Sequence, residues 1–142
     1  MMAGYSGTPL AKKLGIKGDM RVAALNAPAG YASWLKPLPD GARIDSTLPP
    51  TPSAVHLFAT TRRELEQALP RLRKTLDPAG FVWISWPKKS SGVATDVTED
   101  TVRDVALPLG FVDVKVCAVT DVWSELKLVV RKSERRAMAE DR

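Results

Sequence analysis

The chain has 142 residues, 44% hydrophobic and 26% charged, a composition typical of one globular domain. A single cysteine and a single histidine exclude a disulfide framework and a Cys- or His-rich metal site, so we expect no metal. The net charge of +5 favours anionic ligands but does not by itself predict nucleic-acid binding.

The first half of the chain predicts short elements. Thr8 is a suitable N-cap and Pro9 a suitable first helical residue, while residues 20–27 have the apolar pattern of a strand buried on both faces. Pro37 shortens the second predicted helix, and three prolines make residues 46–53 an extended connector. The expected helix, strand, helix and weak strand cover residues 8–15, 20–27, 30–38 and 42–45.

The second half alternates strands with capped helices. Thr61 and Glu64 have the spacing of a capping box, as do Asp96 and Glu99, and Pro70 is expected to kink the first of these helices. The expected elements cover residues 54–59, 61–76, 81–86, 95–110, 111–119 and 123–132. Apolar residues alternate in the last two strands, which places Val112, Val114, Val116 and Ala118 on one face, and Leu126, Leu128 and Val130 on another.

This order of elements predicts an α/β fold. Strands that alternate with helices and end in a closely connected pair indicate a three-layer sandwich, with a Rossmann-like, mostly parallel sheet ending in an antiparallel hairpin. We expect the strand containing Val22 to lie centrally, beside the strand containing Val55. Residues 1–131 are expected to form the single domain, and the charged residues 132–142 a disordered tail.

Residues 14–31, LGIKGDMRVAALNAPAGY, resemble the opening of class I S-adenosylmethionine-dependent methyltransferases. The resemblance continues in DPAGFVWISWP, which is similar to the fifth strand of that fold, and in the last two strands, which are similar to its final hairpin. It therefore covers most of residues 14–132. It implies a minimal form of the fold, because residues 46–53 stand where that family has a helix, a strand and another helix. The phrases GYSGTPL, LGIK, WPKK and DVKVCAV also resemble a bacterial family catalogued as domain of unknown function 3052, which implies no particular activity.

The cofactor motif of the methyltransferases is altered in this chain. By this resemblance, Ala24 stands at the acidic position, Asn26 and Pro28 stand at two glycine positions, and Gly30 alone matches. Side chains and a proline ring oppose the close backbone approach that glycines allow, so we expect no cofactor. In an alternative interpretation, the chain binds S-adenosylmethionine through altered contacts. Asp45, near the end of the predicted second strand, would then bind the ribose hydroxyls.

The remaining sequence offers no catalytic motif. Residues 58–61, FATT, replace the Asn/Asp-Pro-Pro-aromatic motif of amino-group methyltransferases that resemble this fold. His56 lies within a predicted strand and is interpreted as a packed, hydrogen-bonded residue, and Cys117 as a small buried hydrophobe. We therefore predict no catalytic residue.

The stretch WPKKSSG is the candidate ligand site. It follows a predicted parallel strand, and ligands of open α/β sheets bind beyond the carboxyl ends of such strands. Lysines would supply positive charge, serines hydroxyls, and the tryptophan a stacking surface for a flat ring. The candidate residues are Trp86, Lys88, Lys89, Ser90 and Ser91, joined by Asn26 and Tyr31 from the neighbouring strand end.

The sequence therefore predicts a non-catalytic protein that binds a small anionic ligand or a protein partner. The first alternative is a methyltransferase with an atypical cofactor site. The second, less favoured alternative is a nucleic-acid binder that would use Lys12, Lys13, Arg62, Arg63, Lys88 and Lys89. A homodimer is possible from the habits of such folds, and we expect a cytoplasmic protein without membrane contact, since the chain has neither an apolar signal-peptide core nor a long apolar run.

Overall fold

A computed structural model describes residues 9–118, 120 and 122–135. Its strands are β1 (Arg21–Leu25), β2 (Arg43–Asp45), β3 (Ala54–Phe58), β4 (Phe81–Pro87), β5 (Phe111–Ala118) and β6 (Trp123–Val130). Its helices are α1 (Leu10–Lys13), α2 (Tyr31–Trp34), α3 (Arg62–Thr75) and α4 (Glu99–Ala106), with 3-10 turns η1 (Lys89–Ser91) and η2 (Leu107–Leu109). None of the helices in these described ranges is long and apolar enough to span a membrane.

The six strands form one mixed sheet in the order β2-β1-β3-β4-β6-β5. β1 is parallel to β2 and β3, and β3 is parallel to β4, whereas β6 is antiparallel to both β4 and β5. β1 lies inside the sheet beside β3, and the chain ends in an antiparallel pair, which confirms the topology expected from the sequence. Because β2 and β3 lie on opposite sides of β1, the strand order reverses between β1 and β3.

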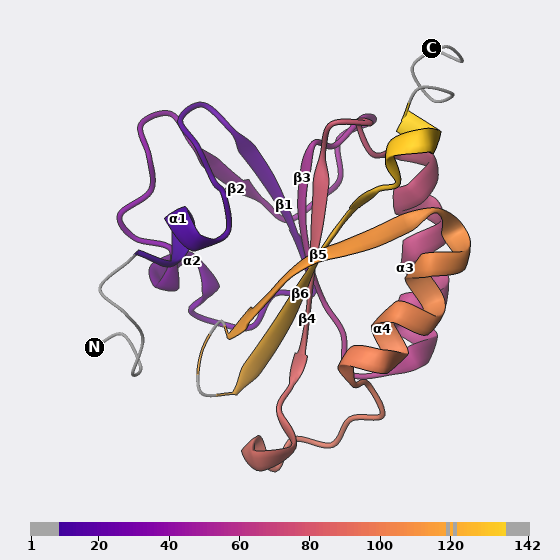
Figure 1. The fold of residues 1–142 in the computed structure, drawn as a ribbon. Helices are drawn as coiled ribbons and strands as arrows, with labels where there is room; N and C mark the ends of the chain where they lie inside the picture. Colours follow the sequence, from indigo (N-terminus) through magenta and orange to yellow (C-terminus); the bar gives the residue numbers. More distant parts are fainter. Residues whose placement is uncertain (1–8, 119, 121, 136–142) are drawn as a thin grey trace.

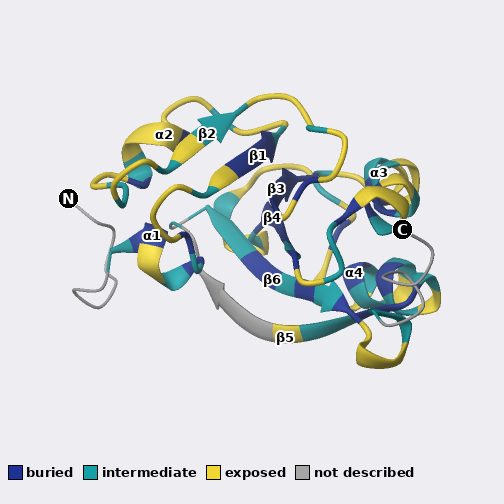
Figure 2. Cartoon of the chain, turned by 90° about the horizontal axis from the view of Figure 1, so that it is seen from above, coloured by how far each residue is buried: buried dark blue, intermediate teal, exposed yellow. Residues whose placement is uncertain are grey.

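Helices cover both faces of the sheet, which confirms the three-layer sandwich (Figure 1 and Figure 2). α3 and α4 lie on one face, where Leu65, Leu69 and Leu72 pack in a cluster with buried strand residues such as Ile84 and Leu126. α1 and α2 lie on the other face over a second cluster that contains Leu14, Leu35 and Trp83. Burial of these apolar side chains on both faces is the main force that holds the layers together.

The N-terminal half has shorter helices than the sequence predicted. α2 ends at Trp34, before Pro37, which has no backbone N–H for a helical hydrogen bond. Pro9 is the N-cap of α1, and the expected cap Thr8 lies outside the described residues. Residues 46–53 contain no helix or strand, as expected for a connector.

α3 begins as predicted. The Thr61 hydroxyl accepts a hydrogen bond from the Glu64 amide, and the Glu64 carboxylate accepts one from the Thr61 amide, which completes the capping box. The helix continues through Pro70 to Thr75.

The predicted cap of α4 is wrong. Its capping box consists of Thr98 and Thr101, not Asp96 and Glu99. Asp96 is engaged elsewhere, because its carboxylate accepts a hydrogen bond from the Arg62 amide at 2.7 Å. Asp96 therefore caps the first turn of α3, and the sequence motif was assigned to the wrong helix.

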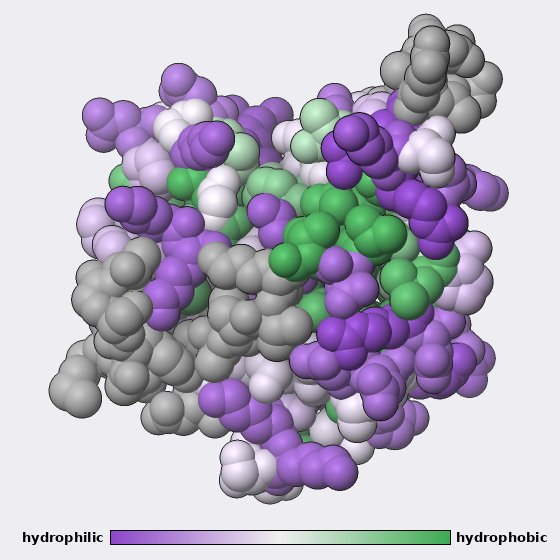
Figure 3. All heavy atoms as spheres, viewed as in Figure 1, coloured by the Kyte–Doolittle hydropathy of each residue, from purple (hydrophilic) through white to green (hydrophobic). Residues whose placement is uncertain are grey.

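β5 departs from the clean alternation expected from the sequence. A register shift between Asp113 and Lys115 interrupts its pairing with β6. Phe111 is fully buried, whereas Val114 is 53% exposed. Apolar side chains gather over the first part of β5 and the adjoining η2 turn (Figure 3). Of the expected apolar face, the side chains of Val116 and Ala118 lie outside the described part of the structure, as does that of Cys117.

Residues 132–135, which the sequence assigns to the tail, form a helical turn. Glu134 in this turn pairs with Arg73 of α3 at 2.9 Å, and Arg131 lies 3.7 Å from the same carboxylate. These contacts attach the start of the predicted tail to the domain.

Candidate functional site

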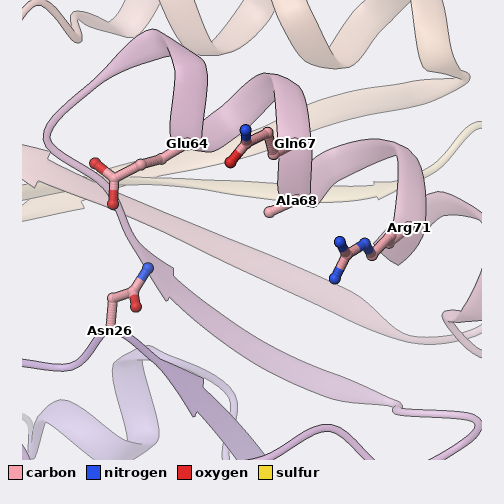
Figure 4. Close-up of a pocket in the computed structure, with 5 residues that line it drawn as sticks. All are labelled: Asn26, Glu64, Gln67, Ala68 and Arg71. Atoms are coloured by element: carbon pink, nitrogen blue, oxygen red, sulfur yellow. The ribbon is translucent and has the colours of Figure 1, made fainter.

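A pocket of about 290 Å³ lies where the strand order reverses. Asn26, which follows β1, forms one side, and one face of α3, which follows β3, forms the other (Figure 4). Ligands of open α/β sheets bind at this position, called the topological switch point. We call this cavity the switch-point pocket. Its lining residues are Asn26, Glu64, Gln67, Ala68 and Arg71.

Asn26 has a left-handed backbone conformation, with φ of 58°, and Gly30 at the end of the same loop has φ of 89°. Asparagine tolerates this region better than most residues with a side chain. The Asn26 side-chain amide donates a weak hydrogen bond to the Phe58 carbonyl at 3.4 Å, which links the ends of β1 and β3. The altered glycine motif therefore still turns sharply after β1.

Glu64 is an ionised carboxylate at the edge of this pocket. Its Oε1 accepts hydrogen bonds from the amides and hydroxyls of Thr60 and Thr61, at 3.0–3.1 Å. Partial burial alone would raise the pKa of Glu64, but these hydrogen bonds outweigh burial and lower it. The side chain therefore carries a negative charge at neutral pH.

Arg71 supplies a positive charge at the other end of the lining. Residues 64, 67, 68 and 71 are three or four apart and so share one face of α3. Arg71 is exposed, and no carboxylate among the described residues forms an ion pair with it. The pocket thus presents separated charges of opposite sign and two amide side chains.

Asp45 does not line this pocket. Its carboxylate forms two contacts with the Arg21 guanidinium, each of 2.9 Å. In the sheet, Asp45 lies beside Ala23, two positions before β1 ends. The ion pair therefore joins Asp45 of the edge strand β2 to Arg21 of β1. The ribose-binding role of Asp45 stays a prediction.

The WPKKSSG stretch begins with the last two residues of β4, Trp86 and Pro87, and continues into the η1 turn beyond the strand (Figure 1). Trp86 is only 6% exposed and packs in the core beneath α3 and α4. The Ser91 hydroxyl donates to the Lys88 carbonyl at 2.6 Å and accepts from the Val93 amide, so it stabilises the turn. Lys89 and Ser90 are exposed.

Of the eight candidate residues, the switch-point pocket contains only Asn26. Anion binding by Lys88 and Lys89 stays a prediction that no contact in the described structure tests. The sequence did not indicate Glu64, Gln67 and Arg71, because a capping residue and polar helix residues normally face solvent. The available signal was positional, since α3 follows the strand beside β1.

Four buried polar side chains meet on the α2 face of the sheet, and we call them the His56 cluster. His56 lies between Tyr31 and Ser85: its Nδ1 is 2.7 Å from the Tyr31 hydroxyl, and its Nε2 is 2.6 Å from the Ser85 hydroxyl. The Glu125 carboxylate lies 3.7 Å from Nε2. Each of the four residues is at most 4% exposed. The expectation of a packed, hydrogen-bonded histidine is confirmed.

Burial fixes the protonation states in this cluster. It lowers the pKa of His56 to about 3, so the ring is neutral at ordinary pH. Burial, and to a smaller extent the Glu125 charge, raise the pKa of Tyr31, so its hydroxyl keeps its proton. The neutral tautomer with its proton on Nε2 lets the Tyr31 hydroxyl donate to Nδ1, while the N–H at Nε2 points toward Ser85 and the Glu125 carboxylate. With no solvent access, the cluster ties α2 to the sheet.

Among the described residues, no group of three or more His, Cys, Asp or Glu side chains gathers as a metal site.

Solved structures share this fold over most of the chain. The fibrillarin pre-rRNA processing protein of Methanococcus jannaschii has a TM-score of 0.58 and 14% identity, covering 90% of this chain and 71% of its own. The DhpI–SAH complex has a TM-score of 0.56 and 14% identity, covering 87% and 83%. Magnesium protoporphyrin IX methyltransferase (ChlM) of Synechocystis PCC 6803, with bound SAM, has a TM-score of 0.55 and 11% identity, covering 87% and 74%.

These comparisons correct one expectation. The chain was predicted to have no cofactor, with S-adenosylmethionine only under an alternative, and this is wrong because structural neighbours with the same fold contain SAM or SAH. No family model and no curated protein matches the chain, so the resemblance to domain of unknown function 3052 finds no support. The structure thus has the mixed, Rossmann-like α/β fold of class I S-adenosylmethionine-dependent methyltransferases.

Proposed function

We propose that this protein binds S-adenosylmethionine, or its demethylated product S-adenosylhomocysteine, in the switch-point pocket. The observation that carries the proposal is that one end of the pocket, at Asn26 and Glu64, lies at the carboxyl ends of β1 and β3, where the strand order reverses. The bound SAM and SAH of two structural neighbours support the choice of ligand.

The donor set fits such a ligand. S-adenosylmethionine has ribose hydroxyls that need acceptors, and a carboxylate that needs a donor. The pocket offers the Glu64 carboxylate and the Arg71 guanidinium, with amide groups from Asn26 and Gln67. When bound, the cofactor would supply an activated methyl group.

We further propose that the chain does not transfer the methyl group itself. The hydroxyls of Thr60 and Thr61, which follow β3, both donate to Glu64. The Thr60 carbonyl accepts from the Thr95 hydroxyl at 2.7 Å. These polar groups at the strand end are engaged within the protein, which supports a binding role over methyl transfer. A protein partner or a second copy of the chain stays a prediction.

Calorimetric titration with S-adenosylmethionine and S-adenosylhomocysteine tests the binding proposal. We expect a dissociation constant in the micromolar range, roughly −8 kcal/mol of binding free energy. Gln67→Trp fills the pocket from an exposed position and should weaken binding at least about tenfold. Lys74→Trp, on the same helix but outside the lining, is the matched control and should bind as the wild type does. Failure of both ligands to bind at millimolar concentration would contradict the proposal.

A labelling experiment tests the absence of methyl transfer. Purified protein is added to a cell lysate with methyl-labelled S-adenosylmethionine, and Gln67→Trp serves as the binding-defective comparison. We expect equal incorporation of label with the two proteins. Greater incorporation with the wild type would show that the chain is a methyltransferase.

A further inference from the structure

α3 presents two opposite charges at the two ends of the switch-point pocket. Glu64 and Arg71 are seven residues apart, so their backbones are separated by about 10 Å along the helix. Figure 4 shows Gln67 and Ala68 between them, with Asn26 across the pocket on the side of Glu64. A small ligand with a single charge could therefore not contact Glu64 and Arg71 at the same time.

Both charged groups are available to a ligand. All the hydrogen bonds that Glu64 receives from Thr60 and Thr61 go to Oε1, which leaves Oε2 for another donor. Two of the arginines on α3 are engaged in ion pairs. Arg62 pairs with Glu66, and Arg73 with Glu134, whereas Arg71 has no ion-pair partner in the part of the chain that the structure describes.

We propose that these charges orient the ligand, with Arg71 binding the carboxylate of its amino-acid portion and Glu64 accepting hydrogen bonds from its ribose hydroxyls. This inference rests on the proposed function. A guanidinium forms paired, charge-assisted hydrogen bonds with a carboxylate, and a carboxylate oxygen accepts from a hydroxyl. The thioether chain between the ribose and the amino acid allows the ligand to reach both ends.

The orientation explains which ligands the pocket distinguishes. A nucleotide has the same ribose hydroxyls, but its 5′-phosphate is attached directly to the ribose, so it places negative charge nearer Glu64 and reaches less far toward Arg71. A nucleoside that lacks the amino-acid portion would keep the Glu64 contact and leave Arg71 in solvent. The pocket therefore favours a nucleoside joined to an amino acid.

Calorimetry with two ligands separates these contributions. S-adenosylhomocysteine has the amino-acid portion, and 5′-methylthioadenosine has the same nucleoside without it. Arg71→Ala should weaken S-adenosylhomocysteine binding about tenfold or more and leave 5′-methylthioadenosine binding unchanged. Arg63→Ala removes another exposed arginine of the same helix that does not line the pocket, and should change neither affinity. Glu64→Gln should weaken both ligands, and thermal unfolding checks that each variant is folded.

The outcomes distinguish the two proposals. If the wild type binds S-adenosylhomocysteine and Arg71→Ala binds it equally well, the orientation is wrong and the proposed function stands. Equal losses for both ligands in Arg71→Ala would also overturn the orientation, because Arg71 would then shape the pocket and not recognise the carboxylate. If the wild type binds neither ligand, the proposed function fails as well.

Discussion

At the scale of single residues, the buried His56 cluster is the most unusual feature of the core. Burying polar groups costs free energy unless each is hydrogen-bonded, and here His56 is bonded on both ring nitrogens. Tyr31, the first residue of α2, directly follows the loop that begins at Asn26. The cluster therefore holds the loop after β1 against the sheet.

The pKa of His56 predicts how stability depends on pH. The folded protein keeps this ring neutral down to about pH 3, while the ordinary pKa of 6.5 applies to the unfolded chain. As pH falls through this window, the unfolded chain takes up a proton that the folded protein does not, so stability decreases. Between pH 6.5 and 5, the titration of His56 should lower the unfolding free energy by about 1.5 kcal/mol.

Urea denaturation at several pH values measures this loss. His56→Gln keeps hydrogen-bonding groups but does not titrate, so its stability should vary less over the same range. Because the chain contains only one histidine, the difference between the two profiles belongs to this residue. Equal slopes for the variant and the wild type would show that His56 is not buried in the neutral form.

At the scale of elements, the start of α3 joins several parts of the molecule. Its capping box uses Thr61 and Glu64, its first amide binds Asp96 from the loop after β4, and its inner face forms the core. The same Glu64 that caps the helix lines the pocket. Helix capping and the candidate site therefore depend on one carboxylate.

The corrected cap of α4 gives a test at this scale. Thr98→Ala should lower the unfolding free energy by about 1 kcal/mol, because it removes the acceptor for the Thr101 amide. Hydrogen exchange at the Thr101 amide should become faster in this variant. Asp96→Ala should instead speed exchange at the Arg62 amide, its hydrogen-bond donor. Faster exchange at the start of α4 in Asp96→Ala would contradict this assignment, because it would show that Asp96 caps α4 as the sequence predicted.

The elements were predictable to different degrees. Long periodic segments such as α3 and β6 were identified because apolar spacing directly reflects which side packs on the core. The cap of α4 was misassigned because Asp96 binds an amide 34 residues away, which local spacing cannot show. The same reason hid the His56 cluster, whose members come from α2, β3, β4 and β6.

The candidate site was predictable only in principle. Ligands of such folds bind at the carboxyl ends of parallel strands, and the lysines and serines after β4 favoured that strand end as the candidate site. The reversal of strand order lies instead between β1 and β3. Motif matching also misjudged Asn26, because a non-glycine residue at that position still has a left-handed backbone.

At the scale of the whole molecule, the sheet order creates the candidate site. The connector 46–53 carries the chain from β2 back to β3 across β1, so the crevice opens beside β1. Helices on both faces hold the strands in place around it (Figure 2). A ligand bound there contacts segments that separate on unfolding, so binding should stabilise the entire fold.

This coupling can be measured by thermal unfolding. S-adenosylhomocysteine at 100 times its dissociation constant should raise the unfolding free energy by about 2.7 kcal/mol. Gln67→Trp should show little of this increase at the same concentration, while Lys74→Trp should show all of it. An equal increase for all three proteins would place the ligand outside the switch-point pocket.

The central claim is that this fold binds a nucleoside ligand at its topological switch point, and a crystal structure of the protein grown with S-adenosylhomocysteine tests it most directly. We predict ligand density between Asn26 and the Glu64–Arg71 face of α3. Ligand density at the Lys88–Ser91 turn instead, or none in the pocket at saturating concentration, would contradict the account.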